Sequence, residues 1–121
     1  MTFPVLICDD SSLARKMAKR SLPPPLQASV VTAENGQQAL DIMLREQITL
    51  LLLDLTMPVL DGVGVLEQIK ARGLEVFVVV VSGDIQPQMQ EKVLSLGALD
   101  FIKKPVDTQR LGAVLKKFGL Y

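Results

Sequence analysis

Five short, mainly apolar runs divide the chain at regular intervals. The central run is four consecutive leucines at 50–53, too short to span a membrane and without helical spacing. The run at 76–81 holds five valines in six residues. Continuous apolar runs of this length, bounded by turn-forming residues, are typical of strands buried on both faces. The sequence therefore predicts strands at 4–8, 29–33, 50–53, 76–81 and 99–102.

A helix is predicted directly after the first strand. Ser11 or Ser12 suits its N-cap, and three consecutive prolines at 23–25 end it. Helical spacing puts Leu13 and Met17 on its inner face. Arg15 falls on the outer, basic face, which we interpret as solvated, with docking of a kinase or another partner as the alternative.

Four further helices follow the remaining strands. They are predicted from about 35 to 45, 61 to 72, 87 to 97 and 107 to 119. Asn35, Asp61 and Asp107 are suitable N-caps, and glycines at 73, 97 and 119 are suitable ends. Leu44 and Phe118 are assigned to the buried stripes of their helices.

The predicted order is strand then helix, five times over, within 121 residues. Such alternation indicates one α/β domain with a parallel sheet, helices on both faces and right-handed crossovers. Ligands of such sheets bind at the carboxyl ends of the strands. The residues that follow each strand are therefore the candidates for a functional site.

Composition removes several classes of function. The sequence has no histidine, which excludes Ser-His-Asp triads and most zinc sites. Thirteen basic and thirteen acidic residues give no net charge, so neither nucleic acid nor an anionic membrane is an expected partner. The amino terminus resembles neither a signal peptide nor a membrane span. A single cysteine allows no internal disulfide and favours a reducing, cytoplasmic location.

Polar residues follow four of the predicted strands. Asp9 and Asp10 end the first, Asp54 the third and Ser82 the fourth, and Lys104 follows the fifth. On neighbouring strands these side chains would converge on one site. Crowded carboxylates favour Mg2+, and a hydroxyl and an ammonium opposite the metal suit the oxygens of a phosphoryl group. Asp54 could then act as a nucleophile and form an aspartyl phosphate.

Together these residues resemble a known family. Asp9-Asp10, Asp54 within D-x-x-M-P-x-x-D-G, Ser82 and Lys104-Pro105 are similar to the receiver domain of two-component response regulators, the CheY-like family. The resemblance covers essentially all of residues 1–121. It implies a flavodoxin-like doubly wound fold with five helices and the strand order 2-1-3-4-5. The sequence contains no separate output domain, and whether the chain is a stand-alone regulator or part of a longer protein stays open.

The resemblance implies a role for each acid. Asp54 is the expected phosphoacceptor and a ligand of Mg2+. Asp10 is expected to bind the metal directly, Asp9 to hold its water ligands, and Thr56 to contribute its backbone carbonyl. The Thr56 side chain, together with Asp84, is expected to influence the access of water to the phosphoryl group.

It also implies how a signal is received and passed on. Ser82 is the expected switch hydroxyl, Lys104 the phosphate-binding lysine and Phe101 the aromatic switch residue, with Lys103 a surface neighbour. The phosphoryl donor would be a sensor histidine kinase or a histidine phosphotransfer protein. The downstream partner would dock on the fourth helix, fifth strand and fifth helix, roughly residues 86–120. No enzymatic activity is expected beyond the chain's own phosphorylation and dephosphorylation.

Other interpretations fit the sequence less well. Phosphatases of the haloacid dehalogenase type have D-x-D after the first strand, whereas here the two acids are adjacent and the nucleophile follows the third strand. Glycine-rich nucleotide-binding motifs are absent from the sequence. Cys8, within an apolar strand, is interpreted as core, and packing alone could explain Phe101. A receiver-like interaction module that works without phosphorylation remains the alternative.

Overall fold

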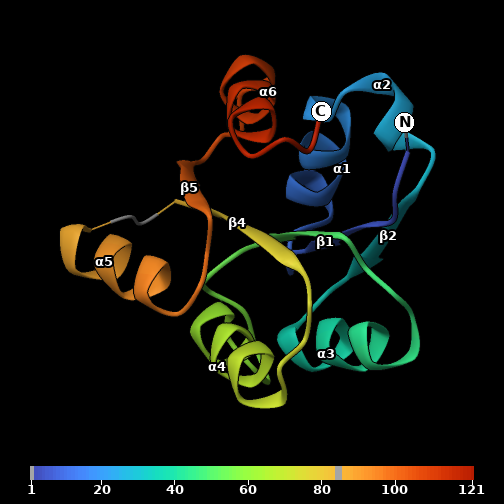
Figure 1. Ribbon diagram of the computed structural model, residues 1–121. Helices are drawn as coiled ribbons and strands as arrows, with labels where there is room; N and C mark the ends of the chain where they lie inside the picture. Colours follow the sequence, from blue (N-terminus) through green and yellow to red (C-terminus); the bar gives the residue numbers. More distant parts are fainter. Residues whose placement is uncertain (1, 84–85) are drawn as a thin grey trace.

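The computed structural model describes residues 2–83 and 86–121 (Figure 1). Its elements are β1 Val5–Cys8, α1 Ser12–Ser21, α2 Pro24–Gln27, β2 Val30–Ala33, α3 Gly36–Arg45, β3 Leu50–Leu53, α4 Gly62–Arg72, β4 Phe77–Ser82, α5 Pro87–Ser95, β5 Asp100–Lys103 and α6 Thr108–Lys117. Each predicted strand is present to within one residue at either end. No helix of the described residues is both long enough and apolar enough to cross a membrane.

All strand pairs in the described sheet are parallel, and the order is β2-β1-β3-β4-β5. This confirms the fold and strand order implied by the sequence. Helices α1, α2 and α6 cover one face of the sheet, and α3, α4 and α5 cover the other (Figure 1). The carboxyl ends of β1, β3 and β4 therefore lie side by side at one edge, where a ligand site is expected.

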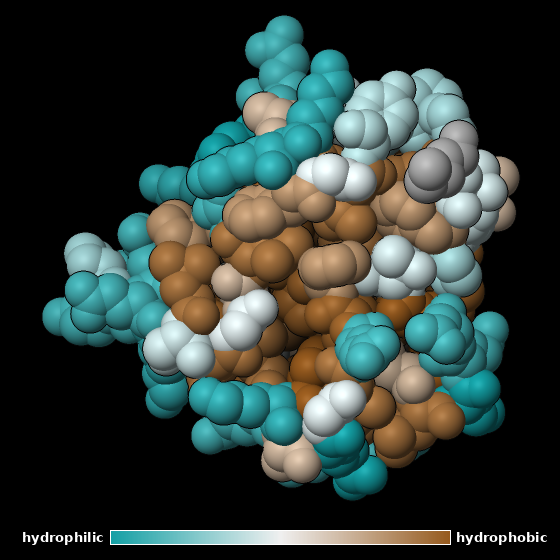
Figure 2. Space-filling view, in the orientation of Figure 1, coloured by the Kyte–Doolittle hydropathy of each residue, from teal (hydrophilic) through white to brown (hydrophobic). Residues whose placement is uncertain are grey.

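The leucine strand β3 forms the centre of two hydrophobic cores. Leu51 and Leu53 pack into the core under α3, α4 and α5, whereas Leu50 and Leu52 pack into the core under α1, α2 and α6. All four leucines are at most 2% exposed, which confirms burial on both faces. Figure 2 shows apolar residues across the middle of one face of the molecule, with hydrophilic residues around much of its periphery.

Side-chain hydrogen bonds fix the helix starts that the sequence predicts. The side chains of Ser11, Asn35, Asp61 and Asp107 each accept a backbone N–H from the first turn of the following helix. Gly73 ends α4 in the left-handed conformation, with a φ of 62°. These helix ends can be predicted from the sequence because a capping interaction involves only residues within one helical turn of the cap.

Three predicted core positions are wrong. Leu13 is 64% exposed, Leu44 49% and Phe118 37%. All three lie near a helix end: Leu13 in the first turn of α1, Leu44 in the last turn of α3 and Phe118 at the C-cap of α6. Helical spacing gives the angle of a side chain around the helix axis but not whether a neighbouring element covers it. The proline run also does more than end α1, because Pro24 begins the short helix α2. The predicted fourth and fifth helices are consequently α5 and α6.

Candidate functional site

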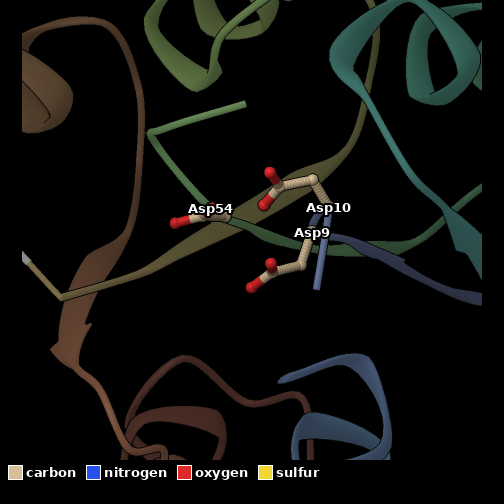
Figure 3. Close-up of side chains that lie close together, drawn as sticks. All are labelled: Asp9, Asp10 and Asp54. Carbon is tan, nitrogen blue, oxygen red and sulfur yellow. The ribbon is translucent and has the colours of Figure 1, made fainter. Parts of the chain in front are cut away.

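Three carboxylates gather at the carboxyl edge of the sheet. Cys8 of β1 pairs in register with Leu53 of β3, so the residues that follow these two strands are neighbours. Asp9, Asp10 and Asp54 each offer a carboxylate oxygen, and these oxygens lie within 4.8 Å of one another (Figure 3). The predicted convergence of the three acids is confirmed.

Lys104 brings a positive charge to these acids from the strand at the edge of the sheet. Its Nζ lies 2.6 Å from Asp9 Oδ2 and 3.4 Å from Asp54 Oδ1. Lys103 pairs with Ser82 in the β4–β5 register and its side chain is exposed. Lys104, and not Lys103, is therefore the lysine that meets the acids, although β5 ends one residue later than predicted, at Lys103.

Burial and charge alter the proton affinity of this pair. Burial raises the pKa of Asp54, and the Asp9 carboxylate raises it further, against the opposing effect of Lys104. Burial lowers the pKa of Lys104, but its hydrogen bond to Asp9 and the charges of Asp54 and Asp9 outweigh that effect and raise it overall. Lys104 is therefore held as an ammonium ion, while the ionised form of Asp54 is disfavoured by its surroundings.

The other expected site residues lie at different depths in the structure. Ser82 is buried at the end of β4, and the Thr56 side chain is exposed in the loop after β3. Phe101 is half-buried on β5, where it is paired in register with Val80 and packs against the core under α3, α4 and α5. Asp84 lies outside the described residues.

Cys8 belongs to the core, as its position in the strand predicts. Its thiol is 3.3 Å from the backbone oxygen of Asn35 and 3.3 Å from Met57 Sδ. Burial and the neighbouring carboxylates of Asp9 and Asp54 raise the pKa of the thiol to about 12. Cys8 is therefore a packing residue with almost no thiolate at neutral pH.

The donor set fits a hard divalent cation. Carboxylate oxygens are the ligands that Mg2+ prefers, together with retained water molecules. Within residues 2–83 and 86–121 the Asp10 carboxylate makes no hydrogen bond or ion pair, and Asp10 is exposed. A cation could therefore bind Asp10 without breaking an interaction, at a site that already carries two further carboxylates.

Comparison with known proteins identifies the family. The response regulator receiver domain family matches residues 5–116. The chain belongs to this family. The receiver is 32% identical over 117 residues to the chemotaxis protein CheY of Bacillus subtilis, covering 97% of this chain and 98% of CheY. Its acidic pocket of Asp9, Asp10 and Asp54 is consistent with a phosphoacceptor site of two-component signalling.

Two further relatives show the range of this family. The probable C4-dicarboxylate response regulator DctR of Bacillus subtilis is 32% identical over 118 residues; the receiver covers 97% of its own chain but only 52% of DctR. The chain thus spans about half the length of that relative. The receiver domain of AraT from Geobacillus stearothermophilus superposes with a TM-score of 0.83 at 30% identity, covering 97% of this chain and 92% of that one.

One residue near the receiver's acids escaped the sequence analysis. Helical spacing predicts Arg15 on the solvated face of α1, yet its side chain is only 16% exposed. Its Nη1 donates to the backbone carbonyl of Asp9 at 2.7 Å, and its Nη2 lies 3.7 Å from Glu34 Oε1. The available signal was an arginine one turn after the N-cap Ser11, from where a long side chain can fold back over the start of its helix.

Proposed function

We propose that this chain is a receiver that accepts a phosphoryl group on Asp54 in a Mg2+-dependent reaction. The observation that supports it most is the position of the Asp54 carboxylate, buried at the end of β3 between two other acids and the Lys104 ammonium. The donor would be the phosphohistidine of a sensor histidine kinase or of a histidine phosphotransfer protein. Beyond this reaction and the hydrolysis of the aspartyl phosphate, which releases inorganic phosphate and restores Asp54, we propose no enzymatic activity.

In the transfer step, an Asp54 oxygen forms a bond to phosphorus. The bond between phosphorus and the donor's imidazole nitrogen breaks, and its electron pair leaves with the imidazole. Ionised Asp54 is the reactive form, and its raised pKa reflects the cost of holding that charge in a buried site. Lys104, held as an ammonium ion within 3.4 Å of Asp54, would pair with a phosphoryl oxygen after transfer.

Mg2+ would be held by Asp9, Asp10, Asp54 and the backbone carbonyl of Thr56. When bound, the metal supplies charge neutralisation between the acids and the incoming phosphoryl group. Asp10 suits direct coordination because its carboxylate has no partner among the described residues. Asp9 suits an outer position because Ser11 N–H already donates to its Oδ1, at 3.0 Å, and Lys104 to its Oδ2.

Phosphorylation by a small donor tests this function. Incubation with acetyl phosphate and Mg2+ should add the mass of one phosphoryl group to the intact protein, and EDTA should prevent it. Hydroxylamine, which cleaves acyl phosphates, should remove the adduct. A protein that stays unmodified with this donor and with a purified phosphohistidine protein would favour the alternative function, an interaction module that works without phosphorylation.

We further propose that Ser82 and Phe101 carry the signal to the surface formed by α5, β5 and α6. The Ser82 hydroxyl would move to donate to a phosphoryl oxygen, and Phe101, on the adjacent strand, would fill the space beside β4. A bias of a few kcal/mol suffices to exchange the populations of such a two-state element. A downstream protein would dock on this surface, roughly residues 86–120.

Asp84 and Thr56 would influence the access of water to the phosphoryl group.

Ser82→Ala tests this route. We expect the variant to keep the phosphoryl adduct but to show much smaller amide NMR shifts over residues 86–120 when beryllofluoride and Mg2+ are added, because the moving donor is gone. Wild-type protein provides the reference shifts. Full-sized shifts near Phe101 in Ser82→Ala would contradict the role of the hydroxyl.

Lys104→Ala and Lys103→Ala form a matched pair. Both remove one positive charge, but only Lys104 contacts Asp9 and Asp54. Lys104→Ala is expected to lose most of the beryllofluoride-induced shifts over residues 86–120, whereas Lys103→Ala should keep them. If Lys103→Ala lost these shifts and Lys104→Ala kept them, the phosphate-binding lysine would be Lys103, and the role proposed for Lys104 would be wrong.

A further inference from the structure

The Asp10 carboxylate is held in place by the main chain alone. Within the described parts of the chain it has no hydrogen-bond or ion-pair partner, while Asp9 beside it uses both carboxylate oxygens. Yet the Asp10 oxygen lies within 4.8 Å of the Asp9 and Asp54 oxygens (Figure 3). The direction of the Asp10 side chain therefore depends on the orientation of the peptide that joins Asp9 to Asp10.

Arg15 holds that peptide. Its Nη1 donates to the Asp9 carbonyl at 2.7 Å, a short charge-assisted hydrogen bond between the side chain of α1 and the end of β1. The N–H of Asp9 is fixed on the other side by the Ala33 carbonyl of β2, at 3.1 Å. Because the N–H and the carbonyl of Asp9 are both hydrogen-bonded, the main chain has a fixed direction where Asp10 begins.

The surroundings of Arg15 keep its guanidinium over this peptide. The Arg15 backbone N–H donates to the carbonyl of the N-cap Ser11 at 3.0 Å. The first turn of α1 therefore fixes the backbone from which the Arg15 side chain extends. The side chain is 16% exposed, and its second contact is the ion pair with Glu34 at the end of β2. The exposed Glu34 carboxylate adds little energy, so the bond to the Asp9 carbonyl is the principal fixed contact.

We propose that Arg15 is a positioning residue for the metal site: it orients the Asp9–Asp10 peptide and thereby aims the Asp10 carboxylate at Mg2+. This inference rests on the proposed binding of Mg2+ by the acids. Arg15 contacts the Asp9 carbonyl and Glu34, and we do not propose it as a metal ligand. Partners that orient metal ligands in this way typically change metal affinity by 10- to 100-fold when they are removed.

The sign of the effect separates positioning from simple electrostatics. Removing a positive charge near three carboxylates should strengthen the binding of a cation if charge were all that mattered. Loss of the positioning bond should weaken it, because the freed carbonyl lets the peptide rotate and the Asp10 carboxylate leave its place. Arg15→Met removes both the charge and the hydrogen bond. A higher Kd for Mg2+ would therefore indicate positioning, and a lower Kd would indicate that only the charge matters.

Calorimetric titration with Mg2+ of the metal-free protein provides the test. We expect the Kd of Arg15→Met to rise about tenfold, and that of Arg15→Lys, which keeps the charge but not the planar guanidinium, to rise by less. Lys16→Met is the matched control, because Lys16 is the exposed neighbour on α1 and loses the same charge. Its Kd should stay the same or fall slightly. The amide NMR signal of Asp10 should move in Arg15→Met without metal and stay in place in Lys16→Met.

Each outcome has a distinct meaning. An unchanged or lower Kd in Arg15→Met, with the wild-type protein binding Mg2+ normally, overturns the positioning role and leaves the proposed function intact. Failure of wild-type protein to bind Mg2+ overturns the metal assignment itself. If thermal denaturation shows that Arg15→Met is unfolded, Arg15→Lys decides: wild-type affinity and an unmoved Asp10 amide in that folded variant contradict the proposal.

Discussion

Asp54→Asn is expected to abolish the phosphoryl adduct completely. An amide has no anionic oxygen to attack phosphorus, while its shape and its contacts at the end of β3 are nearly those of the acid. Intact mass after incubation with acetyl phosphate and Mg2+ measures the loss. Asp61→Asn is the matched control, because Asp61 is an acid of the same loop whose N-cap hydrogen bond asparagine can replace. A full adduct on Asp54→Asn would show that the phosphoacceptor is a residue other than Asp54.

The same substitution should make the metal-free protein more stable at neutral pH. The pKa of Asp54 is raised by burial and by Asp9, so its ionisation in the folded state costs free energy at every pH above that raised pKa. Asparagine removes this cost, so we expect the free energy of unfolding to rise. The gain should disappear in acid, below the ordinary pKa of an aspartate, where Asp54 is protonated in both states. Urea unfolding at neutral and acidic pH, with EDTA, measures it.

Gly62→Ala is expected to cause a large loss of stability directly beside the site. A Cβ at residue 62 would lie 2.3 Å from the backbone oxygen of Asp54 and 2.8 Å from the Cα of Leu55. These are main-chain atoms that cannot move aside cheaply, and Gly62 N–H also donates to the Leu55 carbonyl at 3.0 Å. We expect a loss of about 3 kcal/mol, at the upper end of the cost of overpacking.

Gly112→Ala is the control for the glycine substitution. Gly112 lies within α6, and a Cβ there would meet no atom within 4 Å. Alanine should therefore stabilise the protein by about 1 kcal/mol through its higher helix propensity. Urea midpoints of the two variants should lie on opposite sides of the wild-type value. An unchanged midpoint for Gly62→Ala would mean that the loop after β3 can shift without cost, and would remove the steric explanation for glycine there.

Apart from the short helix α2, the strands and helices and their approximate boundaries are predictable from local patterns in the sequence. Continuous apolar runs predict strands buried on both faces because each strand must cover two cores, as the alternation of Leu50 to Leu53 between the cores demonstrates. Caps such as Ser11 and Asp61 were predictable because their bonds stay within one turn. The acids of the site were predictable because the carboxyl ends of parallel strands share one edge of the sheet, and the distances confirm that convergence.

Which surface each helix covers, and which partner each long side chain meets, depends on the tertiary structure. Helical spacing predicts an inner position for Leu13 and an outer one for Arg15, but in the folded protein Leu13 is 64% exposed and Arg15 reaches back to the Asp9 carbonyl. Spacing reports the angle around a helix axis, whereas exposure depends on where the neighbouring elements end. Likewise, the closer contact of Lys104 with Asp9 than with Asp54 joins residues about 95 positions apart. Which acid Lys104 contacts more closely depends on the strand order and on the length of its side chain, and neither can be predicted from a local sequence pattern.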